Sequence, residues 1–109
     1  MERWQDRQTA MRYNLEWDST KAKQNSRRHK VSFERAATVF RDPNQISIFD
    51  EEHSNDEDRW ITLGLDRNGV LLVVIHTFRQ INRSDVSIRI ISASKATRTE
   101  IKQYEEFNT

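Results

Sequence analysis

The sequence predicts one α+β domain with an antiparallel sheet of about four strands, two helices before the sheet and one helix after it. Three patterns support this prediction: a segment with helical spacing of apolar residues, two strand-like segments joined by an Asn-Gly pair, and an alternating segment near the C-terminus. The strands follow one another instead of alternating with helices, which favours α+β over a βαβ repeat. A chain of 109 residues is long enough to bury its own core.

The two N-terminal helices are predicted from capping residues and apolar spacing. Asp18 can cap a helix over residues 19–29, although Ala22 is almost its only apolar residue. Ser32 can cap a second helix, and Pro43 should end it. Four apolar residues in this second helix recur with helical spacing: Phe33, Ala36, Ala37 and Phe40. The second helix should therefore pack on the sheet.

Short apolar segments separated by turn residues predict the strands, which are expected over residues 13–17, 46–49, 59–65, 70–79 and 86–90. The Asn68-Gly69 pair favours a tight hairpin between the third and fourth of them. The final helix can start after Ser94 or Thr97, and three of its residues are expected to face the sheet: Ile101, Tyr104 and Phe107. Residues 1–13 have no apolar period and are predicted to be a mobile, dispensable extension, which leaves 14–109 as the domain.

Composition excludes several classes of protein. The chain has no cysteine, which rules out a disulfide framework, a thiolate zinc site and a cysteine nucleophile. It has two glycines and no phosphate-cradling glycine loop, and the acidic run over 50–58 lacks the ligand spacing of a calcium loop, which favours a solvated loop. We therefore predict no metal and no other cofactor. With no membrane-length apolar stretch and no signal peptide, the expected location is the cytoplasm.

The formal net charge of +1 conceals a strong segregation of charge. Seven basic residues lie between positions 20 and 41, against one acid: Lys21, Lys23, Arg27, Arg28, Lys30, Arg35 and Arg41. Residues 50–58 carry six acids and no Lys or Arg. Such segregation can produce a basic surface that binds polyanions on a nearly neutral protein.

Two groups of polar residues are candidates for function. Lys21, Asn25 and His29 would form one stripe on a helix, which could meet phosphate or a partner or be a solvated face. The second group lies on the strands and contains Arg59, His76, Arg79 and Arg89. By alternation, His76 lies on the face opposite Arg79. These arginines could form a functional cluster, or they could pair with the acidic loop while His76 serves the core.

Ordered fragments of the chain resemble the BrnT toxin family of the RelE-like superfamily. They include Trp17-Asp18-x-x-Lys21-Ala22-x-x-Asn25-x-x-x-His29, Val31-Ser32-Phe33-Glu34, Asp42-Pro43, Glu57-x-Arg59-Trp60, Leu72-Val73-Val74-x-His76-Thr77, Arg89-Ile90-Ile91-Ser92-Ala93 and Lys95-Ala96-Thr97-Arg98-x-Glu100. The family usually has glycine where this chain has Lys30, and two basic residues where it has Ser94 and Lys95.

The resemblance implies a RelE-like fold and a ribonuclease toxin that a BrnA-like ribbon-helix-helix antitoxin neutralises, with operator DNA bound only through the antitoxin complex. RNA cleavage without a metal needs proton transfer and cations for the phosphate charge. The expected catalytic residues are Arg59, Arg89, and His76 or His29, and the expected RNA-binding residues are Lys21, Asn25, Arg79 and Arg98. The alternative is a noncatalytic toxin-fold module that only binds a partner protein.

Overall fold

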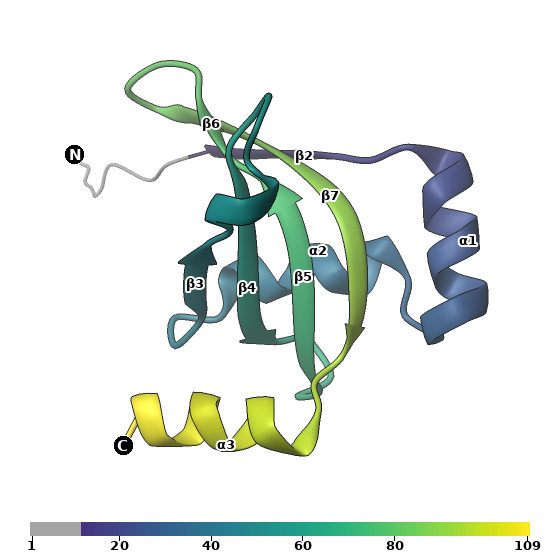
Figure 1. Cartoon of the computed structure of the whole chain (residues 1–109), viewed down its shortest axis with the longest axis vertical. Helices are drawn as coiled ribbons and strands as arrows, with labels where there is room; N and C mark the ends of the chain where they lie inside the picture. Colours follow the sequence, from purple (N-terminus) through teal and green to yellow (C-terminus); the bar gives the residue numbers. More distant parts are fainter. Residues whose placement is uncertain (1–11) are drawn as a thin grey trace.

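The structure is a computed structural model that describes residues 12–109, and it confirms the α+β class (Figure 1). The strands are β2 (Arg12–Glu16), β3 (Ile46–Phe49), β4 (Arg59–Leu65), β5 (Leu71–Thr77), β6 (Arg79–Gln80) and β7 (Asp85–Lys95). The helices are α1 (Ser19–His29), α2 (Phe33–Thr38) and α3 (Arg98–Phe107), and the short 3-10 turns are η1 (Val39–Arg41) and η2 (Glu51–His53). The predicted extension lies outside the described residues up to position 11, and its last two residues belong to β2.

The two N-terminal helices start at the predicted caps. The side chain of Asp18 accepts hydrogen bonds from the backbone N–H groups of Thr20 and Lys21 at 2.8 and 3.1 Å, and α1 covers the predicted residues. The Ser32 hydroxyl caps α2 by accepting from the N–H of Arg35 at 3.1 Å. The chain then passes directly from α2 into η1, so that the apolar face predicted for one helix is shared between two short ones.

The sheet is mixed and wider than the predicted antiparallel one. Its strand order is β2-β7-β5-β4-β3, and β6 pairs with β7. The β3–β4, β4–β5 and β5–β7 pairs are antiparallel, as predicted. β2 instead runs parallel to β7, with Arg12 opposite Asp85, 73 residues away, and Glu16 opposite Arg89. The apolar pattern of a strand specifies which face is buried but not which distant strand lies beside it.

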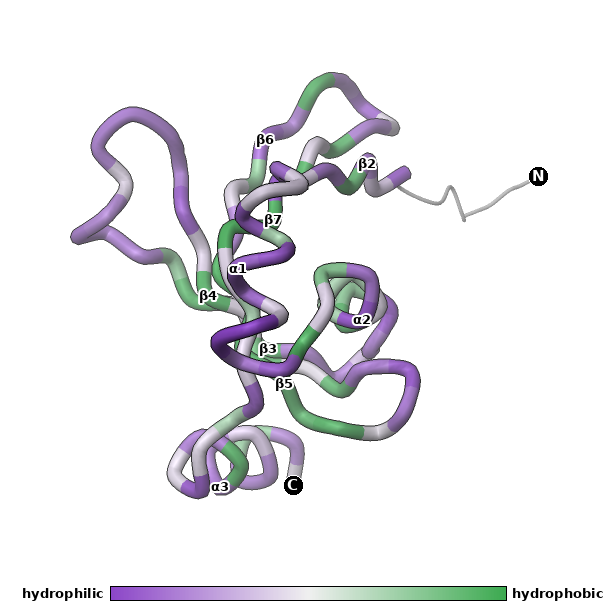
Figure 2. Tube along the Cα trace, turned by 90° about the vertical axis from the view of Figure 1, so that its right-hand side faces the viewer, coloured by the Kyte–Doolittle hydropathy of each residue, from purple (hydrophilic) through white to green (hydrophobic). Residues whose placement is uncertain are grey.

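The two faces of the sheet have different neighbours. One face, which we call the core face, is covered by α2 and η1, which lie behind the sheet in Figure 1. Phe33 is fully buried there and Phe40 is 9% exposed, in agreement with the predicted apolar stripe. The opposite face, which we call the open face, carries α3 at one end and the acidic loop over 50–58 at the other. Figure 2 shows this loop and α2 on opposite sides of the sheet.

Helix α3 covers less of the sheet than its sequence predicts. Thr97 and Glu100 form the predicted capping box, and Tyr104 is buried against Leu63 and Leu71. Two other residues that were expected to face the sheet are exposed, at 40% for Ile101 and 71% for Phe107. The expectation was wrong because α3 crosses only the end of the strands (Figure 1), where one turn of the helix meets the sheet.

A buried carboxylate fixes α3 to the rest of the domain. The Tyr104 hydroxyl donates to Asp42 Oδ2 at 2.6 Å, and the N–H of Leu65 donates to the same oxygen at 2.8 Å. Burial raises the pKa of Asp42, but these hydrogen bonds and one from the N–H of Asn44 together hold it below its ordinary value. Burial and the neighbouring Asp42 carboxylate raise the pKa of Tyr104 to about 12. The hydrogen bond is therefore charge-assisted at neutral pH.

The β4–β5 hairpin forms at the predicted Asn-Gly pair. Gly69 has a φ of +79°, a backbone conformation that side chains disfavour. The carboxylate of Asp66 supports the turn by accepting hydrogen bonds from the N–H groups of Asn68 and Val70 at 2.8 and 2.9 Å. The hairpin places β4 and β5 side by side over their full length.

Lys30 occupies a left-handed position directly after α1, with a φ of 59° and a ψ of 31°. Glycine takes this conformation without the steric cost that a side chain adds. We expect Lys30→Gly to raise the free energy of unfolding by about 0.5–1 kcal/mol, measured by urea denaturation. The control is Lys23→Gly in the exposed interior of α1, where about 1 kcal/mol should be lost. A Lys30→Gly variant less stable than the parent would contradict this account of the turn.

Candidate functional site

Three of the predicted site arginines lie at one end of the open face, on three different strands. Arg59 begins β4 and lies opposite Thr77 of β5. The Thr77 hydroxyl accepts a hydrogen bond from the backbone N–H of Arg89 in β7 at 3.1 Å. Arg79 of β6 is paired with Ser87 of β7, and both line a hollow together with Thr77 and Arg89. The sheet thus gathers residues that are far apart in the sequence.

The hollow at Arg79 and Arg89 has a volume of about 430 Å³ and is bordered by the acidic loop. Its lining includes four carboxylates: Glu16, Asp56, Glu57 and Asp58. Glu57 forms an ion pair with Arg89, and both side chains are about half exposed. The pairing of an arginine with the acidic loop, one of the two alternatives left by the sequence, therefore exists for Arg89. An anion that binds this guanidinium therefore meets Glu57 beside it.

Arg59 lines a separate hollow of about 270 Å³ together with His53, Asn55, Asp56 and Glu57. Its Nε atom is buried and has no hydrogen-bond partner among residues 12–109. The His53 Nδ1 atom lies 2.9 Å from Asp50 Oδ2. His53 was not predicted from the sequence because the acidic run was interpreted as a solvated loop. The available signal was that His53 is the third residue after Asp50, because a single 3-10 turn brings residues at this separation into contact.

His76 lies on the core face, away from the arginines. It is 2% exposed, and its ring packs edge-on against Phe40 with centroids 4.8 Å apart. Nδ1 lies 2.9 Å from the carbonyl oxygen of Thr77, which can only accept, so Nδ1 donates and Nε2 accepts from the Thr62 hydroxyl at 2.7 Å. Burial lowers the pKa of His76, although the bond to Thr77 opposes this effect. The ring is therefore neutral near pH 7 and joins β4 to β5.

Asn25 joins α1 to the edge of β7 that extends beyond β2. Its Nδ2 donates to the carbonyls of Val31 and Ala93 at 3.0 and 2.8 Å, and its Oδ1 accepts from the N–H of Ala93 at 3.1 Å. The side chain is buried and pairs with the backbone of β7 as a neighbouring strand would. These contacts occupy both hydrogens of the amide and hold α1 against β7, and the predicted RNA contact of Asn25 stays a prediction.

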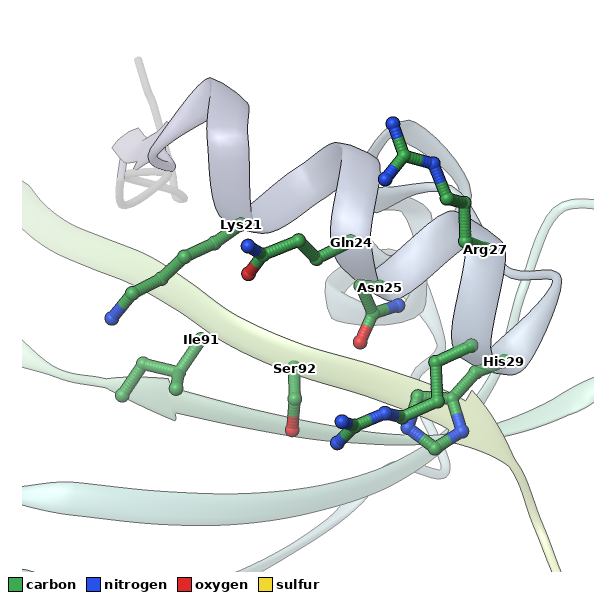
Figure 3. A pocket seen from close by; sticks show the side chains of 8 residues that line it. Lys21, Gln24, Asn25, Arg27, His29, Ile91 and Ser92 are labelled. Carbon is green, nitrogen blue, oxygen red and sulfur yellow. The ribbon is translucent and has the colours of Figure 1, made fainter.

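A basic cleft of about 780 Å³ lies between α1 and β7. Eight residues line it, and none of them is acidic: Lys21, Gln24, Asn25, Arg27, Arg28, His29, Ile91 and Ser92. Figure 3 shows Lys21 and His29 extending past β7 on either side of Asn25. The remaining predicted site residue, Arg98, is exposed at the start of α3 and lines none of the three hollows described here.

Comparison with known proteins decides the family. A family model described as "Ribonuclease toxin, BrnT, of type II toxin-antitoxin system" matches residues 17–100. The chain belongs to the BrnT family. Its structure is similar to the crystal structure of the Brucella abortus ribonuclease toxin BrnT, with a TM-score of 0.56 and 17% identity over 80% of this chain and 100% of that chain. At this identity the structural match shows a shared fold. No curated protein sequence matches the chain.

Membership of the BrnT family confirms the resemblance found in the sequence and implies an RNA substrate and an antitoxin partner. Between residues 12 and 109, no group of three or more His, Asp or Glu side chains is arranged to hold a metal ion. Within the same part of the chain, every helix is too short or too polar to cross a membrane.

Proposed function

We propose that this chain cleaves RNA in a reaction that needs no metal ion or other cofactor, and that a BrnA-like ribbon-helix-helix antitoxin neutralises it. The observation that carries the proposal is the cluster of Arg59, Arg79 and Arg89 at one end of the open face. Guanidinium groups stay protonated and bind phosphate oxygens in bidentate fashion. RNA supplies its own nucleophile, the 2′-hydroxyl beside each phosphate.

In this reaction the 2′ oxygen attacks the phosphorus and the bond to the 5′ oxygen breaks. Arg59 and Arg89 stabilise the negative charge of the phosphorane, and Arg79 holds the neighbouring phosphate. A base takes the 2′-hydroxyl proton, and an acid protonates the departing oxygen. Of the two histidines expected for these transfers, His29 is exposed at the α1–β7 cleft, whereas the burial of His76 favours a structural role.

The α1–β7 cleft is the proposed path of the RNA strand away from the arginines. Ile91, on the floor of the cleft, is two residues from Arg89 in β7, a spacing of about 7 Å in an extended strand. Lys21 and Arg28 supply cations along one side of this path, and Asn25 acts indirectly by holding α1 against β7. Arg98 would contact the RNA outside the cleft.

The antitoxin is proposed to cover the arginine end of the open face. Carboxylates of the antitoxin would take the place of Glu57 on Arg89 and occupy Arg59, because arginine and carboxylate form strong paired hydrogen bonds. Operator DNA is bound through the ribbon-helix-helix partner and not by the toxin alone. The proposed place of action is the cytoplasm, where RNA and antitoxin are both synthesised.

Cleavage of RNA by the purified chain tests the proposal, with free RNA and with mRNA on translating ribosomes as substrates. We expect cleavage to persist in EDTA, because the proposed site uses arginine for charge stabilisation. We expect the product to carry a 2′,3′-cyclic phosphate, because the 2′-hydroxyl is the nucleophile. Complete loss in EDTA with recovery on adding magnesium would show that the reaction depends on a metal. Antitoxin binding without any cleavage would support the noncatalytic interaction module instead.

Arg28→Gln is expected to weaken RNA binding in a salt-dependent way. Removing one cation that binds a phosphate should lower the slope of log affinity against log salt concentration by about 0.7 for a single strand. Fluorescence anisotropy with an RNA oligonucleotide that carries 2′-deoxy substitutions measures binding without cleavage. Arg67→Gln, in the exposed β4–β5 turn, is the matched control and should keep the parental slope. An unchanged slope for Arg28→Gln would show that Arg28 binds no phosphate and would contradict the proposal that RNA passes through the cleft.

A further inference from the structure

We propose that His53, oriented by Asp50, is the general base of the ribonuclease reaction and acts beside Arg59. The inference rests on the proposed function and assigns a catalytic site to the acidic loop. Its substrate is the 2′-hydroxyl of a nucleotide whose phosphate is bound by Arg59. Three features of the loop support it: its anchoring to β4, the orientation of the imidazole and the charges that surround the ring.

The loop is anchored so that Asp50 lies across from Arg59. The N–H of Asp50 donates to the carbonyl of Arg59 at 2.8 Å, which extends the β3–β4 ladder by one residue. The Ser54 hydroxyl donates to the carbonyl of Asp50 at 2.5 Å and accepts from the N–H of Arg59 at 2.9 Å. Opposed residues of an antiparallel pair have Cβ atoms about 5 Å apart. The pairing therefore holds the Asp50–His53 turn next to the first residue of β4.

Asp50 determines which nitrogen of His53 is available. Both carboxylate oxygens approach Nδ1, at 2.9 and 3.1 Å. An ionised carboxylate only accepts hydrogen bonds, so Nδ1 carries the hydrogen and the neutral ring presents its lone pair at Nε2. The His53 side chain is 60% exposed, whereas that of Asp50 is 16% exposed. A catalytic histidine in a Ser-His-Asp triad is held in one tautomer by a carboxylate in the same way, and here the carboxylate is the less exposed of the two side chains.

Charged side chains of both signs surround His53. Asp56, Glu57 and Arg59 line the same hollow, and Asp50 contacts the ring directly. Arg59 makes no ion pair with any residue from 12 to 109, in contrast to Arg89, which is held by Glu57. Arg59, like Arg79, can therefore bind a phosphate without first losing an acidic partner.

The proposed step exchanges one bond between phosphorus and oxygen for another and changes no oxidation state. Nε2 of neutral His53 takes the proton of the 2′-hydroxyl as the bond between the 2′ oxygen and phosphorus forms. The bond from phosphorus to the 5′ oxygen breaks, and water donates the proton that this oxygen requires. The products are a 2′,3′-cyclic phosphate and a 5′-hydroxyl end, and the imidazolium then returns its proton to water.

The test measures kcat and KM for RNA cleavage by the full-length chain and by His53→Ala. Because general base catalysis contributes about 100-fold or more, we expect kcat to fall by at least that factor with KM little changed. Added imidazole should restore part of the lost rate to His53→Ala. Asp50→Asn should lower kcat less than His53→Ala does and leave KM little changed, because it removes the carboxylate that holds the hydrogen on Nδ1. Glu105→Gln, on the exposed side of α3, is the matched control for the loss of one carboxylate and should leave kcat unchanged.

Circular dichroism and thermal unfolding should show that His53→Ala folds as the parent does, because the side chain is exposed. A folded His53→Ala variant that retains the parental kcat would overturn the assignment while leaving the ribonuclease function intact. A lower kcat that added imidazole does not rescue would also overturn it, since it would mark a purely structural role. Absence of cleavage by the parental chain on both substrates would refute the proposed function, and this inference with it.

Discussion

Replacing Asn25 with leucine is expected to lower the free energy of unfolding by about 3 kcal/mol or more, because a buried polar group left without a partner costs about 1–3 kcal/mol. Leucine has nearly the same size but no hydrogen-bonding atoms. It would leave the carbonyls of Val31 and Ala93 and the N–H of Ala93 without their present partner. Urea denaturation followed by circular dichroism measures the loss, and the midpoint should fall with no change in slope.

Gln24→Leu is the matched control for stability. It also replaces an amide side chain of α1 with leucine, but Gln24 is exposed to solvent. Its effect should stay within about 0.5 kcal/mol. Helix α1 buries almost no apolar side chain, so Asn25 supplies much of what holds it on β7. We therefore expect Asn25→Leu to weaken RNA binding as well. A loss of stability below about 1 kcal/mol would mean that α1 is held by other contacts.

Local chemistry explains which elements could be predicted from the sequence. The caps at Asp18, Ser32 and Thr97 act on backbone groups within three residues, so each is visible in a short stretch of sequence. The turn at Gly69 depends on one residue's backbone preference. The parallel pairing of β2 with β7 joins distant segments, and the limited contact of α3 depends on where that helix crosses the sheet. Local spacing of residues contains neither piece of information. The prediction of a purely antiparallel sheet and the prediction that Ile101 and Phe107 face the sheet were therefore wrong.

In the candidate site too, features set by the local backbone could be predicted, and features set by distant contacts could not. Strand alternation separated the face of His76 from that of Arg79, because the period of a strand is fixed by its backbone. The roles of Asn25 and His53 depended instead on contacts that cross the fold or follow the path of a loop. The backbone groups that bind Asn25 belong to Val31 and Ala93. The carboxylate that orients His53 was visible in the sequence only as part of an acidic run, because the turn that brings the two side chains together is set by the path of the loop.

Arg59→Ala is expected to lower kcat for RNA cleavage by about 100- to 1,000-fold, the cost typical of removing one donor that stabilises transition-state charge. Arg59 begins the strand beside the Asp50–His53 pair and makes no ion pair within residues 12–109. Its Nε atom is buried, so the terminal nitrogens of the guanidinium are the ones that would bind the phosphate. KM should change less than kcat, because the charge on the phosphate grows as the 2′ oxygen attacks. Arg67→Ala in the exposed hairpin turn is the control and should cleave at the parental rate.

The same substitution should weaken antitoxin binding, because an antitoxin that masks this end of the open face would place a carboxylate on Arg59. Calorimetry with the antitoxin measures this effect, and removal of one paired charge should reduce affinity by at least tenfold, or about 1.4 kcal/mol. Arg59→Lys tests whether charge alone suffices, since lysine keeps the charge but loses the planar fork. If Arg59→Ala cleaves poorly but binds the antitoxin as tightly as the parent, the partner neutralises the toxin from another surface, and the basic cleft between α1 and β7 is the next surface to test by Arg28→Gln.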